Sequence, residues 1–296
     1  MSILGVVGTG TMGCTAAERW RAAGLEIVGY DLSSRCVERG RQAGVRMCAS
    51  LHELAVATRH IVLFLPGPME IEATLCDPDG LLAYAAMGTI IIDMCTSAPK
   101  TTQAMSKKAA LSGVSYLDAP VLGRPASIGN WALPVGGDPK VLEKCRPFLQ
   151  HVATQIIHIG PSGSGHKVKL LNQMMFGAIN AMTAEMMAVA EQVGIAPKLL
   201  YDTITTSRAG TMSNLFVELG RRVCQDDYDN PTFSVELLTK DVRLGLEMAN
   251  EAGAVPLIGQ TVDFLNKSAR AKGFGAQDCA CMWRAVRQIW QPGDEK

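Results

Sequence analysis

The chain has 296 residues, 28 basic and 28 acidic side chains, and a hydrophobic fraction of 48%. Its length allows two domains with a large buried core, and its balanced charge gives no electrostatic footprint for nucleic acid or an anionic membrane surface. No apolar run reaches the roughly 18 residues that span a bilayer, so we expect no membrane partner.

The nine cysteines are scattered without a C-x-x-C pair. Cys279 and Cys281 fall in a predicted helix without neighbouring histidines, so no metal site is expected. The first predicted strand begins two residues after Met1, which predicts no signal or transit peptide. Reduced thiols and the lack of a leader indicate a cytoplasmic protein.

The first predicted elements are a buried strand over 3–7 and a helix that follows a glycine turn. The turn has the pattern G-x-G-x-x-G at Gly8, Gly10 and Gly13. In a dinucleotide-binding fingerprint the first glycine permits the tight turn, the second admits a pyrophosphate, and the third lets helix and strand pack closely. The N–H groups at the start of the helix would then face the phosphates. The other predicted cofactor-binding residues of this turn are Thr9, Thr11 and Met12.

A second predicted strand, 26–30, ends at Asp31. An acidic side chain about 20 residues past the glycines is the partner that the ribose hydroxyls of NAD require. Asp31 therefore favours NAD, because a carboxylate repels the 2′-phosphate of NADP. Arg35 and the pair 33–34 lie close enough to leave NADP as an alternative. A glycine-rich turn in a domain without a cofactor is the competing interpretation.

Further apolar runs alternate with helical patterns through the first half of the chain. Near-continuous Val, Ile and Leu runs separated by helices predict an α/β fold with a doubly wound, mostly parallel sheet. In such a sheet the ligand binds at the carboxyl ends of the strands. The later strands are predicted at 45–48, 60–65, 89–94, 115–118, 132–135 and 155–159.

The composition changes at the glycine-rich segment 160–165, and the strand signal vanishes beyond it. One long helical pattern runs from His166 to about Val193. We therefore predict a dinucleotide-binding domain over 1–161 and an all-helical domain over 162–296, built on a long interdomain helix. Further helices are predicted at 197–206, 212–223, 234–252, 256–271 and 276–290.

Two predicted loops lie where the fourth and fifth strands end. Leu65 and Pro66 begin a proline-rich turn whose backbone would lie beside the cofactor, although a plain end of the strand explains it as well. Thr96 would face the nicotinamide in one interpretation, and in the other Thr96 or Ser97 caps the helix that starts at Pro99. The sequence leaves both pairs of interpretations open.

A third loop follows the predicted strand 115–118. Backbone N–H groups around Leu122 and Gly123 would form an anion-binding concavity for a substrate carboxylate. Arg124 would add a guanidinium, whose geometry matches a carboxylate. The alternative for Arg124 is an ordinary solvated side chain.

Lys169 lies one turn inside the long helix, with Asn172 and Gln173 three and four residues further on the same face. Partial burial would lower the pKa of this lysine toward neutrality and make it a catalytic acid and base, which the two amides would orient. A lysine that merely extends to solvent from an apolar helix is the alternative. His166 is a rival base, and an inward Lys240 could reach the cofactor.

With these motifs in hand, the chain resembles the β-hydroxyacid dehydrogenase family, and it has some features of L-threonate dehydrogenases. The resemblance runs from residue 3 to about 288 and includes the glycine turn, the segment 118–121 and the Lys169 helix. It implies a Rossmann domain, a helical domain and an active site between them. It further implies that Lys169 is the catalytic acid and base, that Thr96 and Lys240 contact the cofactor, and that Leu122 and Gly123 border the substrate carboxylate.

The chain departs from the family pattern in two segments. Leu122-Gly123-Arg124 stands where the family usually has Ser-Gly-Gly, so a serine hydroxyl is lost. Gln173 stands where an asparagine is usual, with Asn172 one position earlier, and L-threonate dehydrogenase-like members carry a similar glutamine. Both changes affect the expected substrate and leave the lysine in place.

The sequence therefore predicts NAD(P)-dependent hydride transfer to or from a small hydroxy acid. Imine reduction on the same scaffold and a non-catalytic nicotinamide-binding module are the alternatives; relatives that reduce imines usually replace the lysine. The long Ala- and Met-rich helix offers more apolar surface than a small domain can bury, which predicts a homo-oligomer, a dimer or tetramer.

Overall fold

The computed structural model describes residues 3–207 and 213–290. The chain divides into two compact units, Met1–Lys169 and Leu170–Lys296, which are described separately below. Helix α8, Ser164–Gln192, runs through the boundary between them.

The first unit is built on one eight-stranded sheet with the order β3-β2-β1-β4-β5-β6-β7-β8. Every neighbouring pair is parallel except β6 and β7, which are antiparallel and meet at Asp118 and Gly136. This confirms the predicted doubly wound, mostly parallel sheet. The strands are β1 (Ile3–Val7), β2 (Glu26–Tyr30), β3 (Arg46–Met47), β4 (His60–Leu63), β5 (Ile90–Asp93), β6 (Ser115–Asp118), β7 (Trp131–Gly136) and β8 (Ala153–Gly160).

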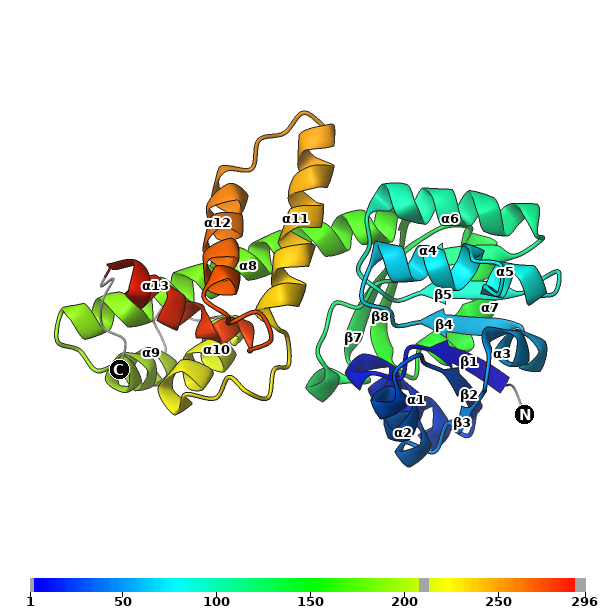
Figure 1. Ribbon diagram of the computed structural model, residues 1–296, viewed down its shortest axis with the longest axis horizontal. Coiled ribbons are helices and arrows are strands. Elements are labelled where there is room, and N and C mark those ends of the chain that lie inside the picture. The colour runs from blue at the N-terminus through cyan, green and yellow to red at the C-terminus, as the bar shows by residue number, and fades with distance from the viewer. Residues whose placement is uncertain (1–2, 208–212, 291–296) are drawn as a thin grey trace. The chain divides into compact units, whose positions relative to one another are not determined.

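Helices cover both faces of this sheet, because successive side chains of a strand point to opposite faces. In β5, Ile91 packs into a core with α3, α4, α5 and α6, whereas Ile90 and Ile92 pack into a second core with α1 and α7. Figure 1 shows α4, α5 and α6 along one side of the sheet. The helices are α1 (Thr11–Ala22), α2 (Ser34–Gln42), α3 (Leu51–Ala57), α4 (Pro68–Cys76), α5 (Leu81–Tyr84), α6 (Pro99–Leu111) and α7 (Pro139–Leu149).

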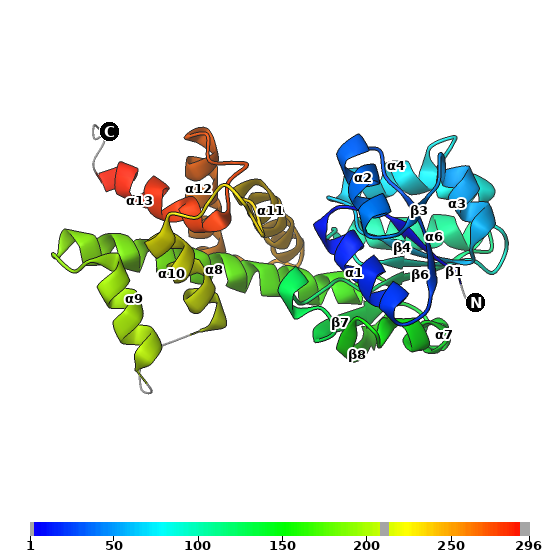
Figure 2. The ribbon, with the colours of Figure 1, turned by 90° about the horizontal axis from the view of Figure 1, so that it is seen from below.

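The second unit is mainly helical over its described residues, as predicted. Its core gathers small side chains of α8, such as Ala184 and Ala188, with leucines and valines of α10 and α11. A Cβ atom at Gly177 would lie 2.8 Å from a methyl carbon of Val262, so α8 and α12 pack closely there. Figure 2 shows α11, α12 and α13 along one side of this part of α8. Besides α8, the unit holds α9 (Pro197–Thr206), α10 (Asn214–Gln225), α11 (Val235–Glu251), α12 (Leu257–Ala271) and α13 (Met282–Trp290).

Two predicted helix starts differ from the structure. Residue 212, the predicted start of one helix, lies outside the described residues, and α10 begins at Asn214, with the Ser213 hydroxyl accepting the Phe216 N–H. The helix predicted from 276 begins later, because Asp278 accepts the N–H of Ala280 and caps a short 3₁₀ turn over Cys279–Cys281. The turn then continues into α13.

Candidate active site

The glycine turn between β1 and α1 has the geometry of an anion-binding helix start. Gly8 has φ +94°, and a Cβ atom there would overlap the Phe64 carbonyl. A Cβ at Gly13 would overlap the Gly8 carbonyl oxygen. Around Gly10, in contrast, a Cβ would meet no atom within 4 Å, and α1 has no side-chain cap. The open space and uncapped N–H groups suit a pyrophosphate, so the residues present match a dinucleotide.

Asp31 follows β2 and holds the turn in place. Its Oδ2 accepts the Thr9 N–H at 2.7 Å, and its Oδ1 accepts the Ser33 N–H at 2.9 Å. Each carboxylate oxygen has a further lone pair for a ribose hydroxyl. The Arg39 guanidinium donates to the Thr11 hydroxyl at 3.0 Å. Sequence reasoning missed Arg39, since nothing in the run of α2 distinguishes it from the neighbouring arginines.

The loops that follow β4 and β5 are tied to each other. The Leu65 N–H donates to the Cys95 sulfur at 3.0 Å. Helix α6 begins at Pro99 with Ala98 as its N-cap, so neither Thr96 nor Ser97 occupies the capping position. The capping interpretation of Thr96 is therefore wrong, and Thr96 lies half-buried in the loop at the carboxyl end of β5.

The loop after β6 is fixed mainly through its backbone. The Leu122 N–H donates to the Ala132 carbonyl at 2.9 Å, so it is not available for the predicted anion site. This corrects the expectation for Leu122 and leaves the Gly123 N–H. A Cβ at Gly123 would overlap the indole of buried Trp131, which explains the glycine. Trp131 Nε1 donates to the Arg124 carbonyl at 2.8 Å and holds this corner.

Lys169 projects from α8 toward the same loop. Its Nζ donates to the Val121 carbonyl oxygen at 2.8 Å, and the contact is partly buried. The glycine turn, the loops after β4, β5 and β6, and Lys169 all belong to the first unit.

His166, the rival base, is completely buried. Its Nδ1 lies 2.6 Å from the Thr102 hydroxyl, and its Nε2 lies 3.2 Å from the Cys95 carbonyl oxygen. With both nitrogens engaged and no solvent exposure, the imidazole cannot meet a substrate hydroxyl. The interpretation of His166 as a base is therefore wrong.

The predicted partners of Lys169 on α8 have their contacts in the second unit. Gln173 is buried, and its Nε2 donates to Asp241 Oδ2 at 2.6 Å. The Asn172 amide donates to Gln173 Oε1 at 3.3 Å. Lys240 pairs with the other oxygen of Asp241 at 2.8 Å. Asp241 thus joins Gln173 to Lys240.

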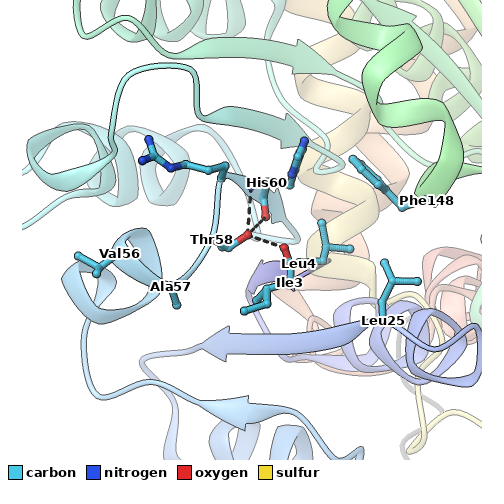
Figure 3. Close-up of a pocket in the computed structure, with 9 residues that line it drawn as sticks. Ile3, Leu4, Leu25, Val56, Ala57, Thr58, His60 and Phe148 are labelled. Carbon is cyan, nitrogen blue, oxygen red and sulfur yellow. Dashed lines mark hydrogen bonds between the residues drawn. The ribbon is translucent and has the colours of Figure 1, made fainter. Parts of the chain in front are cut away.

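A separate pocket of about 360 Å³ lies at the opposite edge of the sheet, at the amino ends of β1 and β4 (Figure 3). The Thr58 hydroxyl there donates to the Ile3 carbonyl at 2.6 Å, and the His60 ring meets Phe148 edge-on at 5.0 Å between centroids. Ligands of open α/β sheets bind at the carboxyl ends of the strands, so this pocket is not part of the candidate site. The described residues hold no cluster of three or more metal-ligating side chains and no helix long and apolar enough to cross a membrane.

The chain matches two family models. Residues 3–160 match the NAD-binding domain of 6-phosphogluconate dehydrogenase, and residues 163–286 match the NAD-binding model of NADP-dependent 3-hydroxyisobutyrate dehydrogenase. The 2-(hydroxymethyl)glutarate dehydrogenase of Eubacterium barkeri is 30% identical over 97% of this chain and 94% of its own length.

Two further proteins agree with these matches. A 3-hydroxyisobutyrate dehydrogenase of Pseudomonas aeruginosa is 30% identical over 84% of this chain and 85% of its own length. The crystal structure of a 3-hydroxyisobutyrate dehydrogenase from Salmonella typhimurium superimposes with a TM-score of 0.88 at 26% identity, covering 96% of this chain and 99% of that one. The chain therefore belongs to the β-hydroxyacid dehydrogenase family, whose members are NAD(P)-dependent oxidoreductases that act on hydroxy acids.

Proposed function

We propose that this protein transfers a hydride between NAD(P) and a small hydroxy acid, with Lys169 as the catalytic acid and base. The observation that supports the proposal is the hydrogen bond from Lys169 Nζ to the Val121 carbonyl. Lys169 belongs to the same unit as the glycine turn, where α1 begins without a side-chain cap. An ammonium group has three N–H donors. The Val121 carbonyl accepts one of them and so fixes the ammonium group beside the loop that follows β6.

Bound NAD(P) supplies a nicotinamide ring that exchanges a hydride with the carbinol carbon. During oxidation, Lys169 as a neutral amine takes the proton of the substrate hydroxyl. During reduction, Lys169 as an ammonium returns that proton to the carbonyl oxygen. Assistance of this kind contributes roughly 10²–10⁴-fold to a rate.

We propose that the glycine turn, Leu65, Pro66, Thr96 and Lys240 contact the cofactor. We assign the substrate carboxylate to the Gly123 N–H and the Arg124 guanidinium, which matches a carboxylate in a bidentate arrangement. Relatives named for 2-(hydroxymethyl)glutarate, 3-hydroxyisobutyrate and L-threonate support a substrate that carries both a carboxylate and a hydroxyl group.

The contacts of the two amides change their proposed roles. Gln173 uses its amide on Asp241 and accepts from Asn172, so we assign it to positioning Asp241 and Lys240. Asn172 is exposed on α8 and is the amide that remains to orient Lys169.

The test compares Lys169→Ala with Lys167→Ala, since Lys167 is an exposed lysine two residues earlier on the same helix. Lys169→Ala should bind NADH normally, measured by its fluorescence, and lose at least about 100-fold in kcat. Lys167→Ala should match the wild type. Retained turnover in Lys169→Ala would contradict the assignment.

The substrate is sought by an NAD- and NADP-reduction screen over 3-hydroxyisobutyrate, L-serine, glycerate, threonate and 4-hydroxybutyrate, with a cyclic imine assayed in the reductive direction. Turnover of the imine alone would favour an imine reductase. Nucleotide binding without turnover of any compound would favour a non-catalytic module. We propose NAD as the preferred cofactor because the carboxylate of Asp31 would repel a 2′-phosphate.

We further propose a homo-oligomer formed through one face of α8. Leu171, Met175, Met182 and Met186 are each 40–65% exposed. At about 100° per residue their spacings of 4, 7 and 4 place them within about 60° of one another around the helix. Such a continuous apolar stripe suits a second copy of this chain. A cytoplasmic location is proposed because none of the nine cysteines, all of which lie in the described part of the chain, forms a disulfide.

A further inference from the structure

Two buried carboxylates lie side by side beneath the candidate site. Asp93 ends β5 and Asp118 ends β6, and the two are register partners, so their side chains point to the same face of the sheet. Both are completely buried. Buried carboxylates require hydrogen-bond donors, and the identity of these donors shows what the pair holds in place.

Asp118 binds the start of α8. Its Oδ1 accepts the Gly163 N–H at 2.8 Å and its Oδ2 accepts the His166 N–H at 3.0 Å. A Cβ at Gly165 would lie 2.9 Å from Oδ2, so the glycine leaves room for the carboxylate. Burial raises the pKa of Asp118, while the charge of His166 and the two N–H donors act in the opposite direction. The carboxylate thus fixes the first turn of the helix that carries Lys169.

Asp93 binds the loop that carries Thr96. Its Oδ1 accepts the Cys95 N–H at 3.0 Å, and its Oδ2 accepts the Tyr116 hydroxyl at 2.6 Å. The two neighbouring carboxylates therefore hold two different parts of the candidate site, the loop after β5 and the start of α8.

The His166 ring connects these two parts. Its Nε2 lies 3.2 Å from the Cys95 carbonyl oxygen and 3.9 Å from Asp93 Oδ2, both of which can only accept, so Nε2 carries a proton. Its Nδ1 lies 2.6 Å from the Thr102 hydroxyl oxygen, which is also 3.2 Å from the Ala98 carbonyl oxygen. The contacts with Cys95 and Thr102 lie in the segment 95–102, on either side of the start of α6.

The contacts of the His166 ring join two segments that carry proposed site residues. Cys95 directly precedes Thr96, and His166 precedes Lys169 by three residues, about 4.5 Å along the helix axis. We propose that His166, together with Asp118, is a positioning residue that holds the helix turn carrying Lys169 at a fixed distance from the loop carrying Thr96. This inference rests on the proposed function of Lys169 and adds the two residues that align the Lys169 side chain.

The role is positioning and not catalysis, because the imidazole is fully buried and both its nitrogens are engaged. Displacement of a reacting group by about 1 Å costs up to about 100-fold in rate. Loss of the ring contacts should therefore lower kcat while the glycine turn, and with it cofactor affinity, stays intact.

The test uses the full-length protein and a substrate found in the screen. His166→Phe keeps a ring without hydrogen bonds and should lower kcat by about tenfold or more, with the Kd for NADH within about twofold of the wild type. His166→Gln keeps one donor and one acceptor and should restore most of the lost kcat. His60→Phe, the same substitution at the amino end of β4, is the matched control and should leave kcat unchanged.

Thr102→Val removes only the hydroxyl that faces Nδ1 and should also lower kcat with unchanged NADH affinity; it carries the test if His166→Phe does not fold. The pH–rate profile of each folded variant should keep the limb assigned to Lys169. A wild-type kcat in His166→Phe, or equal losses in His166→Gln and His166→Phe, would overturn the inference. A lost pH limb in His166→Phe would do the same, since His166 would then be the base. Turnover in Lys169→Ala would instead overturn the proposed function.

Discussion

The three glycines of the turn after β1 should respond differently to a single added methyl group. Gly8 has φ +94°, a conformation that costs an L-residue roughly 1–3 kcal/mol, and its new Cβ would overlap the Phe64 backbone. At Gly13 the Cβ would overlap the Gly8 carbonyl. Movement of Phe64 would disturb the hydrogen bond that its N–H donates to the Val7 carbonyl of β1, and movement of the Gly8 carbonyl would disturb the turn into α1.

Gly10 is different because its φ of −69° and ψ of −164° are open to any residue, and its Cβ would meet nothing within 4 Å. Alanine is a poorer N-cap than glycine, but it also reduces the entropy of the unfolded chain. These two effects, each of about 1 kcal/mol or less, oppose one another. Gly10→Ala should therefore fold normally, while its methyl group occupies the space a pyrophosphate needs.

The assay is thermal unfolding paired with NADH titration for the three alanine variants. One kcal/mol shifts Tm by roughly 2–4 °C in a domain of 150–250 residues. Gly8→Ala and Gly13→Ala should lower Tm by about 5 °C or more. Gly10→Ala should stay within about 2 °C and lose at least about tenfold in NADH affinity. Wild-type affinity in a folded Gly10→Ala protein would refute the assignment of this turn to the cofactor.

Three further results are expected. Asp31→Asn keeps an acceptor for the turn but loses its charge, so the ratio of NADP to NAD affinity should rise about tenfold or more in a fluorescence titration; an unchanged ratio would contradict the proposed preference. Met182→Glu places a charge in the apolar stripe of α8 and should convert an oligomer to a smaller species in light scattering, whereas Lys167→Glu should not. Burial lowers the pKa of His60, so the folded state binds protons less well than the unfolded one; this contribution to stability is present above about pH 6.5 and is lost as the pH falls from there through the folded pKa. His60→Phe should therefore lose less stability than the wild type between pH 7.5 and 5.5 in urea unfolding, and equal losses would show that His60 does not contribute.

The fold was predictable because it depends on local patterns. Apolar runs such as 90–93 are short and bounded by turns, which is the sequence pattern of a strand buried on both faces. In the structure the residues of this run alternate between two cores, one on each face of the sheet. The long helix was predictable for the same reason, since its pattern runs unbroken from the glycine segment. Helix starts were less certain, because a cap such as Asp278 depends on a single hydrogen bond.

The details of the candidate site were harder to predict because they depend on contacts between distant residues. The Leu122 N–H looked free in the sequence, but the antiparallel bridge to Ala132 uses it. His166 looked solvated in the first turn of a helix, but Thr102 and Cys95 lie 64 and 71 residues away and enclose it. The sequence did contain one indication of buried polar contacts here, since two successive buried strands, β5 and β6, each end in aspartate.

The departure from the family pattern at Leu122 occurs where the backbone is held independently of the side chain. The backbone of Leu122 is fixed by two hydrogen bonds to Ala132, and Gly123 is fixed by the indole of Trp131. A change from serine to leucine at 122 therefore alters a side chain without moving the loop. Lys169 reaches the same loop through the Val121 carbonyl, which any side chain at 122 leaves in place. The contact that positions the proposed acid and base therefore does not depend on the side chain at residue 122. A substitution there can alter which substrate binds without displacing Lys169.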